Sequence, residues 1–76
     1  MRSRNLNDHE EYQVMLSDLT AYEEAGISLT LSGKPSTPRE VTYACTVREH
    51  GSYMRDYVPG EDGRLREIRF DKVRIG

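Results

Sequence analysis

The chain has 76 residues, of which 36% are apolar and 32% are charged, with a formal net charge of −2. This length predicts one domain over residues 1–76 that buries only about 60% of its unfolded surface, and the composition is too apolar for a disordered chain. No apolar run is long enough for a transmembrane helix, and the basic first residues are not followed by the apolar stretch of a secretory signal. Cys45 has no second cysteine to pair with. We therefore expect a protein of the reducing cytoplasm with no membrane contact.

The first predicted element is a long amphipathic helix from about Asp8 to Ala25. Asn7 or Asp8 supplies the N-cap, and acidic residues follow in the first turn, where the helix dipole favours them. Gly26 suits the position just after the helix, and residues 1–6 are expected to fray. The apolar side chains recur at helical spacing along one stripe: Tyr12, Met15, Leu16, Leu19 and Tyr22.

A strand and a second helix are expected next. Residues 27–31 alternate apolar and polar, as a half-buried strand does, and turn residues follow in 32–36. Thr37, Pro38 and Glu40 then provide an N-cap, a proline at the first helical position and the acid of a capping box.

The segment 41–47 is ambiguous between a helix and a strand. Its β-branched residues alternate as in a strand, whereas Val41, Ala44 and Cys45 have helical spacing. The capping box favours the helix, which we expect to run from Pro38 to about Glu49.

The C-terminal part predicts a β-hairpin, with strands at 53–58 and 64–70 joined by residues 59–63. A five-residue connection sets a register in which opposite charges face each other and apolar residues face each other. The predicted pairs are Asp56 with Arg66, Arg55 with Glu67, Met54 with Ile68 and Tyr57 with Leu65. Asp71 and Lys72 interrupt the alternation, so we expect a bulge there. The order α-β-α-β-β predicts an α+β fold, in which the long helix packs on a small three-stranded antiparallel sheet.

Charge is distributed unevenly along the chain. Residues 5–33 contain six acids and no Lys or Arg, whereas residues 63–76 contain five basic residues and two acids. The acids of the first helix lack a basic residue four positions later, which would stabilise the helix. We therefore expect them to meet a partner with a basic surface, such as a nucleic-acid-handling protein; the alternative is a solvated face balanced by the basic hairpin. The candidate partner-binding residues are Glu10, Glu11, Asp18 and Glu24.

The basic hairpin suggests a second hypothesis, a small DNA-associated regulator of a mobile element. Its arginines would contact phosphates and its aromatic residues would stack on bases. The residues concerned are Arg64, Arg66, Arg69, Arg74, Tyr53, Tyr57 and Phe70. An isoelectric point near 5.6 and the facing acids Asp56 and Glu67 argue against direct nucleic-acid binding.

A structural zinc ion is the alternative to a cofactor-free domain. Cys45, His50 and His9 are the candidate metal ligands, because thiolate and imidazole suit zinc. The chain has no CxxC or HxxxH element, so the alternative is a buried cysteine and two surface histidines. Cys45 and His50 also resemble half of a nucleophile–base pair, but no phosphate-binding loop or dinucleotide motif accompanies them. We expect a protein that is not an enzyme.

A homodimer is a further alternative, because the chain has no Trp and its predicted core is small, so a second copy could help to stabilise it. Phe70, Val73 and Ile75 end the predicted sheet, whose edge offers a pairing site for a second copy. Tyr53, Tyr57 and Met54 could supply an aromatic contact patch, and the competing interpretation is that these three side chains form the core.

Two stretches, LTLSGKPSTPREV at 29–41 and GSYMRDY at 51–57, resemble short accessory proteins of phages and mobile elements of Gram-positive gut bacteria. The resemblance covers most of the chain after the first helix. Small acidic proteins of that origin include the anti-CRISPR proteins, which often occupy the basic nucleic-acid channel or a recognition lobe of an RNA-guided nuclease. The resemblance implies a stoichiometric inhibitor, with a Cas9-type nuclease as its target, and assigns no functional residues.

Overall fold

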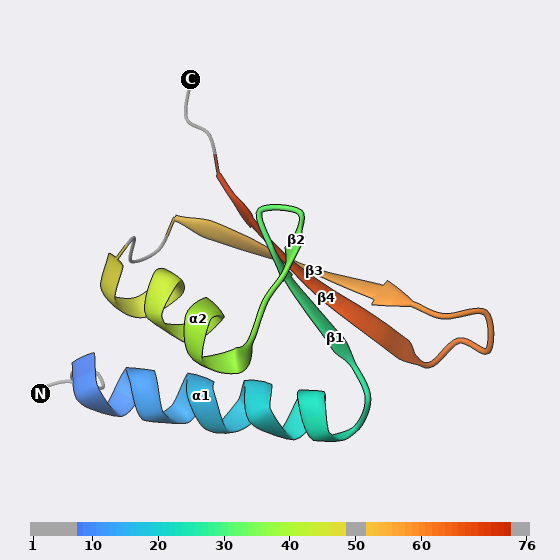
Figure 1. Cartoon of the computed structure of the whole chain (residues 1–76), viewed down its shortest axis with the longest axis horizontal. Coiled ribbons are helices and arrows are strands. Elements are labelled where there is room, and N and C mark those ends of the chain that lie inside the picture. The colour runs from blue at the N-terminus through green and yellow to red at the C-terminus, as the bar shows by residue number, and fades with distance from the viewer. Residues whose placement is uncertain (1–7, 49–51, 74–76) are drawn as a thin grey trace, which may run out of the picture.

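The computed structural model describes residues 8–48 and 52–73, which form two α-helices, a π-helical segment and a four-stranded mixed sheet (Figure 1). The elements in chain order are α1 (Asp8–Glu24), β1 (Ser28–Leu31), β2 (Lys34–Pro35), α2 (Pro38–Tyr43), the π-helix η1 (Ala44–Arg48), β3 (Tyr53–Pro59) and β4 (Leu65–Lys72). The sheet order is β2-β1-β4-β3. The predicted α+β class is therefore confirmed.

Helix α1 ends as its sequence predicts, at a glycine in the left-handed backbone region. Gly26 has φ +89°, its N–H donates to the carbonyl of Glu23 at 2.9 Å, and the N–H of Ile27 donates to the carbonyl of Tyr22 at 3.0 Å. These two bonds form a Schellman motif, which satisfies carbonyls at the helix end. The motif reverses the chain, so that β1 returns along the sheet beside α1.

We expect Gly26→Ala to lower the free energy of unfolding by about 1–2 kcal/mol, because a Cβ in the left-handed region meets its own backbone. The cost is conformational, since a Cβ at this position would meet no atom within 4 Å. Gly60→Ala is the matched control, because Gly60 does not have a left-handed φ and its Cβ would make ordinary contacts at 3.4–3.6 Å. Urea denaturation should show the loss for Gly26→Ala, and equal losses in the two variants would contradict this explanation.

Helix α2 begins at the predicted cap, and the ambiguous segment after it is helical. The N–H of Glu40 donates to Thr37 Oγ1 at 3.1 Å, with Pro38 at the first helical position. The carboxylate of Glu40 accepts a hydrogen bond from Ser36 Oγ at 3.0 Å. Beyond Tyr43 the backbone widens into η1, which ends at Arg48; the predicted end at Glu49 lies outside the described residues.

The prediction of a three-stranded antiparallel sheet is wrong in two respects. Ser32 and Gly33 both have positive φ, 53° and 83°, which is the conformation of a two-residue hairpin turn, so Lys34 and Pro35 return as the additional strand β2. In addition, β1 pairs in parallel with β4, with Leu29 beside Ile68. The segment between these strands contains α2, η1 and β3, and it is long enough for the crossover that parallel pairing requires.

The predicted hairpin register is also wrong. Asp56 pairs with Arg69 and Arg55 with Phe70, and the irregularity lies at Val58 and Pro59 instead of at Asp71 and Lys72. This register places Phe70 and Ile68, both almost fully buried, on the face that the helices cover. The predicted register differs from the observed one by an odd number of residues, so it would turn the other side of β3 toward the core. The observed register puts Tyr53, which packs against the core, on this side instead of Asp56, and apolar burial is worth more than exposed ion pairs, which contribute about 0–1 kcal/mol each.

The core lies between the two α-helices and one face of the sheet. It is formed by Leu19 from α1, Val41 from α2, and Leu29, Ile68 and Phe70 from the sheet. The β3–β4 hairpin projects beyond this core, away from the helices (Figure 1). Within residues 8–48 and 52–73, no helix is long and apolar enough to cross a membrane.

Candidate functional site

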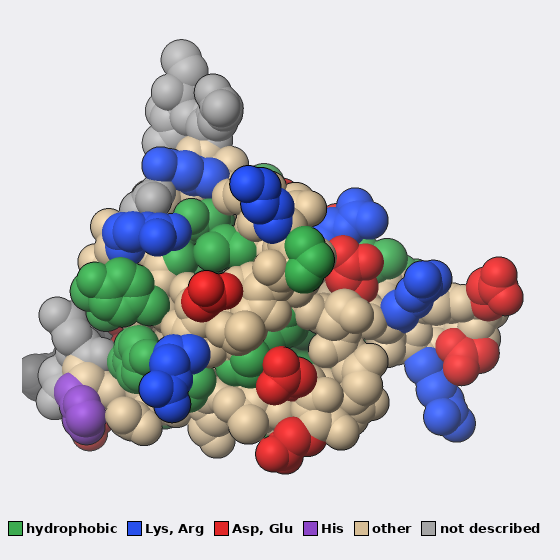
Figure 2. All heavy atoms as spheres, in the orientation of Figure 1, with side chains coloured by type: hydrophobic (Ala, Val, Ile, Leu, Met, Phe, Trp, Pro, Cys, Tyr) green, Lys and Arg blue, Asp and Glu red, His purple; other side chains and the backbone are tan. Residues whose placement is uncertain are grey.

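Three of the four carboxylates predicted to bind a partner lie on the exposed side of α1. Glu10, Asp18 and Glu24 are all exposed, whereas Leu19 on the opposite side is fully buried. At 3.6 residues per turn, the three acids fall within roughly one third of the helix circumference, spread over about 20 Å of its length. We call these three residues the acidic face of α1. Figure 2 shows acidic side chains over the C-terminal half of this helix.

Glu11, the fourth predicted residue, belongs to a different surface. It is half-buried and lines a hollow of about 230 Å³ together with Cys45, Arg55 and Phe70. Helical periodicity alone places Glu11 on the same side as Met15, four residues later, which packs against the core. Glu11 is nevertheless only about 20° from Asp18 around the helix, because the two are seven residues apart, so periodicity does not separate it from the other three acids. Its half-burial depends on the residues from other elements that line the hollow.

The acidic face has no counter-charge for its second half within the described structure. Neither the carboxylate of Asp18 nor that of Glu24 forms a hydrogen bond or ion pair with any residue of 8–48 or 52–73. Of the arginines predicted to balance them, Arg69 pairs with Glu67 on β4 at 3.1 Å, and Arg74 lies outside the described residues. None of the hairpin arginines that the structure describes forms an ion pair with Asp18 or Glu24, although Arg64 and Arg66 line a hollow together with Gly26, two residues beyond Glu24.

The hairpin that appeared basic in the sequence is electrically neutral in the structure. Residues 53–72 contain five basic and five acidic side chains, because the first strand and the connection contribute three acids of their own. The two kinds of charge alternate along the projecting hairpin in Figure 2. The basic side chains are Arg55, Arg64, Arg66, Arg69 and Lys72, and the acidic ones are Asp56, Glu61, Asp62, Glu67 and Asp71.

The aromatic residues proposed to stack on bases differ in their surroundings. Phe70 is 1% exposed, and the guanidinium carbon of Arg55 lies 5.2 Å from its ring centre, so Phe70 cannot meet a base. Tyr57 is exposed and accepts a hydrogen bond from Arg55 at 3.1 Å, and Tyr53 is half-buried. The hairpin therefore lacks the continuous aromatic platform that single-stranded nucleic acids require.

The residues proposed for self-association do not form a sheet edge. Strand β4 lies between β1 and β3, and Phe70 belongs to the core. Val73 is partly exposed, and Ile75 lies outside the described residues. The edges of the described sheet are β2 and β3, so β4 does not provide the pairing edge that the sequence suggested, and a homodimer stays a prediction.

The structure describes two of the three candidate zinc ligands. His9 is exposed near the start of α1, Cys45 is half-buried in η1, and His50 lies outside the described residues. Among the residues that the structure describes, no three His, Cys, Asp or Glu side chains are grouped closely enough to hold a metal ion. A zinc site that includes His50 stays a prediction.

Burial raises the pKa of the Cys45 thiol, and the nearby guanidinium groups of Arg55 and Arg48 lower it by less. A raised pKa leaves less thiolate at neutral pH, whereas catalytic cysteines are activated by a lowered pKa. We expect alkylation of Cys45 to follow a pH profile whose midpoint is higher in the folded protein than in urea, because unfolding removes the burial. A kinetic titration with iodoacetamide checks this, and a lower midpoint in the folded state would contradict it.

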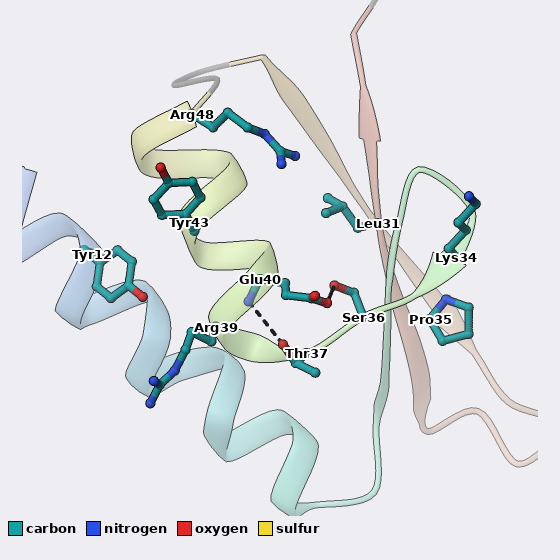
Figure 3. Close-up of a pocket in the computed structure, with 10 residues that line it drawn as sticks. All are labelled: Tyr12, Leu31, Lys34, Pro35, Ser36, Thr37, Arg39, Glu40, Tyr43 and Arg48. Atoms are coloured by element: carbon teal, nitrogen blue, oxygen red, sulfur yellow. Dashed lines mark hydrogen bonds between the residues drawn. The ribbon is translucent and has the colours of Figure 1, made fainter.

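A second surface, which the sequence did not indicate, lies between the helices and the β1–β2 turn. It is an open hollow of about 680 Å³ with lining residues from α1, β1, β2, α2 and η1 (Figure 3). Three of the lining side chains are basic: Lys34, Arg39 and Arg48. Because these residues are separated in sequence and surrounded by ordinary turn and cap signals, no local pattern identifies them as one site.

No protein-family model, no curated protein and no solved structure matches the chain.

Proposed function

We propose that the chain is a small binding protein without enzymatic activity, which inhibits a bacterial nucleic-acid-handling protein by covering part of its basic surface. The acidic face of α1 is the proposed contact. A Cas9-type nuclease is the specific target suggested by the resemblance to anti-CRISPR proteins. The reducing cytoplasm is the proposed compartment, where such a target acts and a single cysteine stays reduced.

The observation that supports this proposal is the pair Asp18 and Glu24, exposed on α1 without a counter-charge in the described structure. Exposed charges of one sign on a rigid element attract a surface of opposite sign, and they accelerate the encounter. The lysines and arginines of a nucleic-acid channel are such a surface. The neutral hairpin makes the protein a better match for this target than for nucleic acid itself, which needs cations to neutralise phosphates.

The test is a cleavage assay with purified guide-loaded Cas9-type nuclease and increasing amounts of the full chain. We expect cleavage to fall to zero near one inhibitor per nuclease. Binding of the chain to double-stranded DNA is measured in parallel across salt concentrations. Cleavage that continues at a large excess of the chain would overturn the nuclease target, and salt-sensitive DNA binding would favour the mobile-element regulator instead.

A further inference from the structure

We propose that the hollow between α2, η1 and the β1–β2 turn binds an acidic peptide segment, with its carboxylates at the basic side chains and an apolar side chain against Leu31 and Tyr43. The volume of about 680 Å³ is within the range of sites that hold a drug-sized ligand or a few peptide residues. This site is independent of the acidic face of α1, and it selects a ligand of the opposite charge.

The charges that line the hollow favour an anion. Lys34, Arg39 and Arg48 contribute three positive charges, and Glu40 contributes one negative charge. The side chains of Lys34 and Arg39 are exposed, and neither forms a hydrogen bond or ion pair with another residue of the described ranges. Arg48 donates to the hydroxyl of Tyr53 at 3.5 Å, which holds the side chain over the sheet. The lining therefore has a net positive charge, and its basic side chains differ in whether they are bonded to other residues of the protein.

The arrangement of the basic groups favours an extended ligand. Figure 3 shows that Arg48 points from η1 toward Leu31, Lys34 lies across the hollow on β2, and Arg39 points toward α1. A single phosphate group is bound by donors that converge on one point, whereas here the donors are distributed around the rim. Carboxylates spaced along a peptide can meet such donors one by one, and guanidinium groups bind carboxylates in bidentate fashion.

The polar groups beside the cations favour a peptide over a nucleic acid. The carboxylate of Glu40 stands in the wall of the hollow, where it bonds with Ser36 at 3.0 Å, and it repels phosphates and carboxylates alike. A peptide can place its neutral backbone at this point, whereas a nucleic-acid backbone carries a charge at every unit. The same carboxylate can accept an N–H from a peptide. Leu31 and Tyr43, which is 49% exposed, supply apolar surface for one side chain of the ligand.

The experiment uses a fluorescein-labelled synthetic peptide in which Asp and Glu flank a central Leu-Phe pair, and it measures fluorescence anisotropy with the full chain. We expect saturable binding that weakens with salt. Lys34→Glu/Arg39→Glu should weaken it by about tenfold or more, since each change replaces an attraction by a repulsion. Arg64→Glu/Arg66→Glu makes the same change in net charge on the projecting hairpin, and it should alter binding by less than about twofold.

Two further measurements separate this site from general charge attraction. Tyr43→Ala removes exposed apolar surface without changing the charge, and it should weaken the peptide several-fold while circular dichroism shows an unchanged fold. A peptide with Lys in place of Asp and Glu should not displace the labelled acidic peptide from this hollow, even if it binds the acidic face of α1. The proposal is overturned if the acidic peptide does not bind, if the hairpin variant weakens binding as much as Lys34→Glu/Arg39→Glu, or if single-stranded DNA of equal length binds more tightly at the same salt concentration.

Discussion

Phe70→Ala is expected to leave the domain largely unfolded at room temperature in low concentrations of urea. Phe70 is 1% exposed and packs in the cluster that joins Leu19 of α1 to Ile68 of β4. Truncation of a buried Phe costs about 3–5 kcal/mol, and a domain of this length has a free energy of unfolding of roughly 4–11 kcal/mol. The variant also removes the ring that lies 5.2 Å from the guanidinium of Arg55. Urea denaturation followed by circular dichroism measures the loss.

Tyr57→Ala is the matched control for this prediction. Tyr57 is an aromatic residue on the same hairpin and the same face of the sheet, opposite Ile68, but it is 49% exposed. We expect a loss of about 1 kcal/mol or less, because exposed substitutions away from caps and cores have small effects. If the two variants had equal urea midpoints, Phe70 would not be part of the core, and the hypothesis that it contacts a base would have to be reconsidered.

The helices were predictable because their signals are local. The cap formed by Thr37 and Pro38 stands directly at the start of its helix, and Gly26 ends α1 because glycine readily adopts the left-handed backbone conformation. The same cap resolved the ambiguity at 41–47, where β-branched residues alone favoured a strand. The hydrogen bonds of such caps join residues that are close in the sequence, so a short stretch of sequence is sufficient to predict them.

The sheet was predicted only in part, because strand pairing depends on distant residues. The hairpin register inferred from charge pairs differs from the observed one, which turns Tyr53 instead of Asp56 toward the core. The parallel pair of β1 and β4 joins residues about forty positions apart, and neither strand contains a signal for the other. The acidic face could be derived from helical periodicity, whereas the basic hollow exists only after five elements have packed together.

Asp18→Lys/Glu24→Lys is expected to slow association with a basic partner by about tenfold or more at low ionic strength, with a smaller effect on dissociation. Both residues are exposed on α1, and neither contributes to the core, so the fold should be unchanged. The rate constant is measured by stopped-flow or surface plasmon resonance with the nuclease that the cleavage assay identifies. The difference from the unchanged protein should shrink as salt is raised, because the Debye length falls from about 10 Å at 0.1 M to about 3 Å at 1 M.

Glu61→Lys/Asp71→Lys separates a local contact from an effect of net charge. This variant changes the net charge by the same amount, but both residues belong to the β3–β4 hairpin and its connection instead of to α1. A contact through the acidic face requires the α1 variant to lose much more of the association rate than the hairpin variant. Equal losses would show that only the overall charge of the protein steers the encounter. An unchanged rate in the α1 variant would mean that the partner is held elsewhere, with the basic hollow as the next surface to test, because three cations line it.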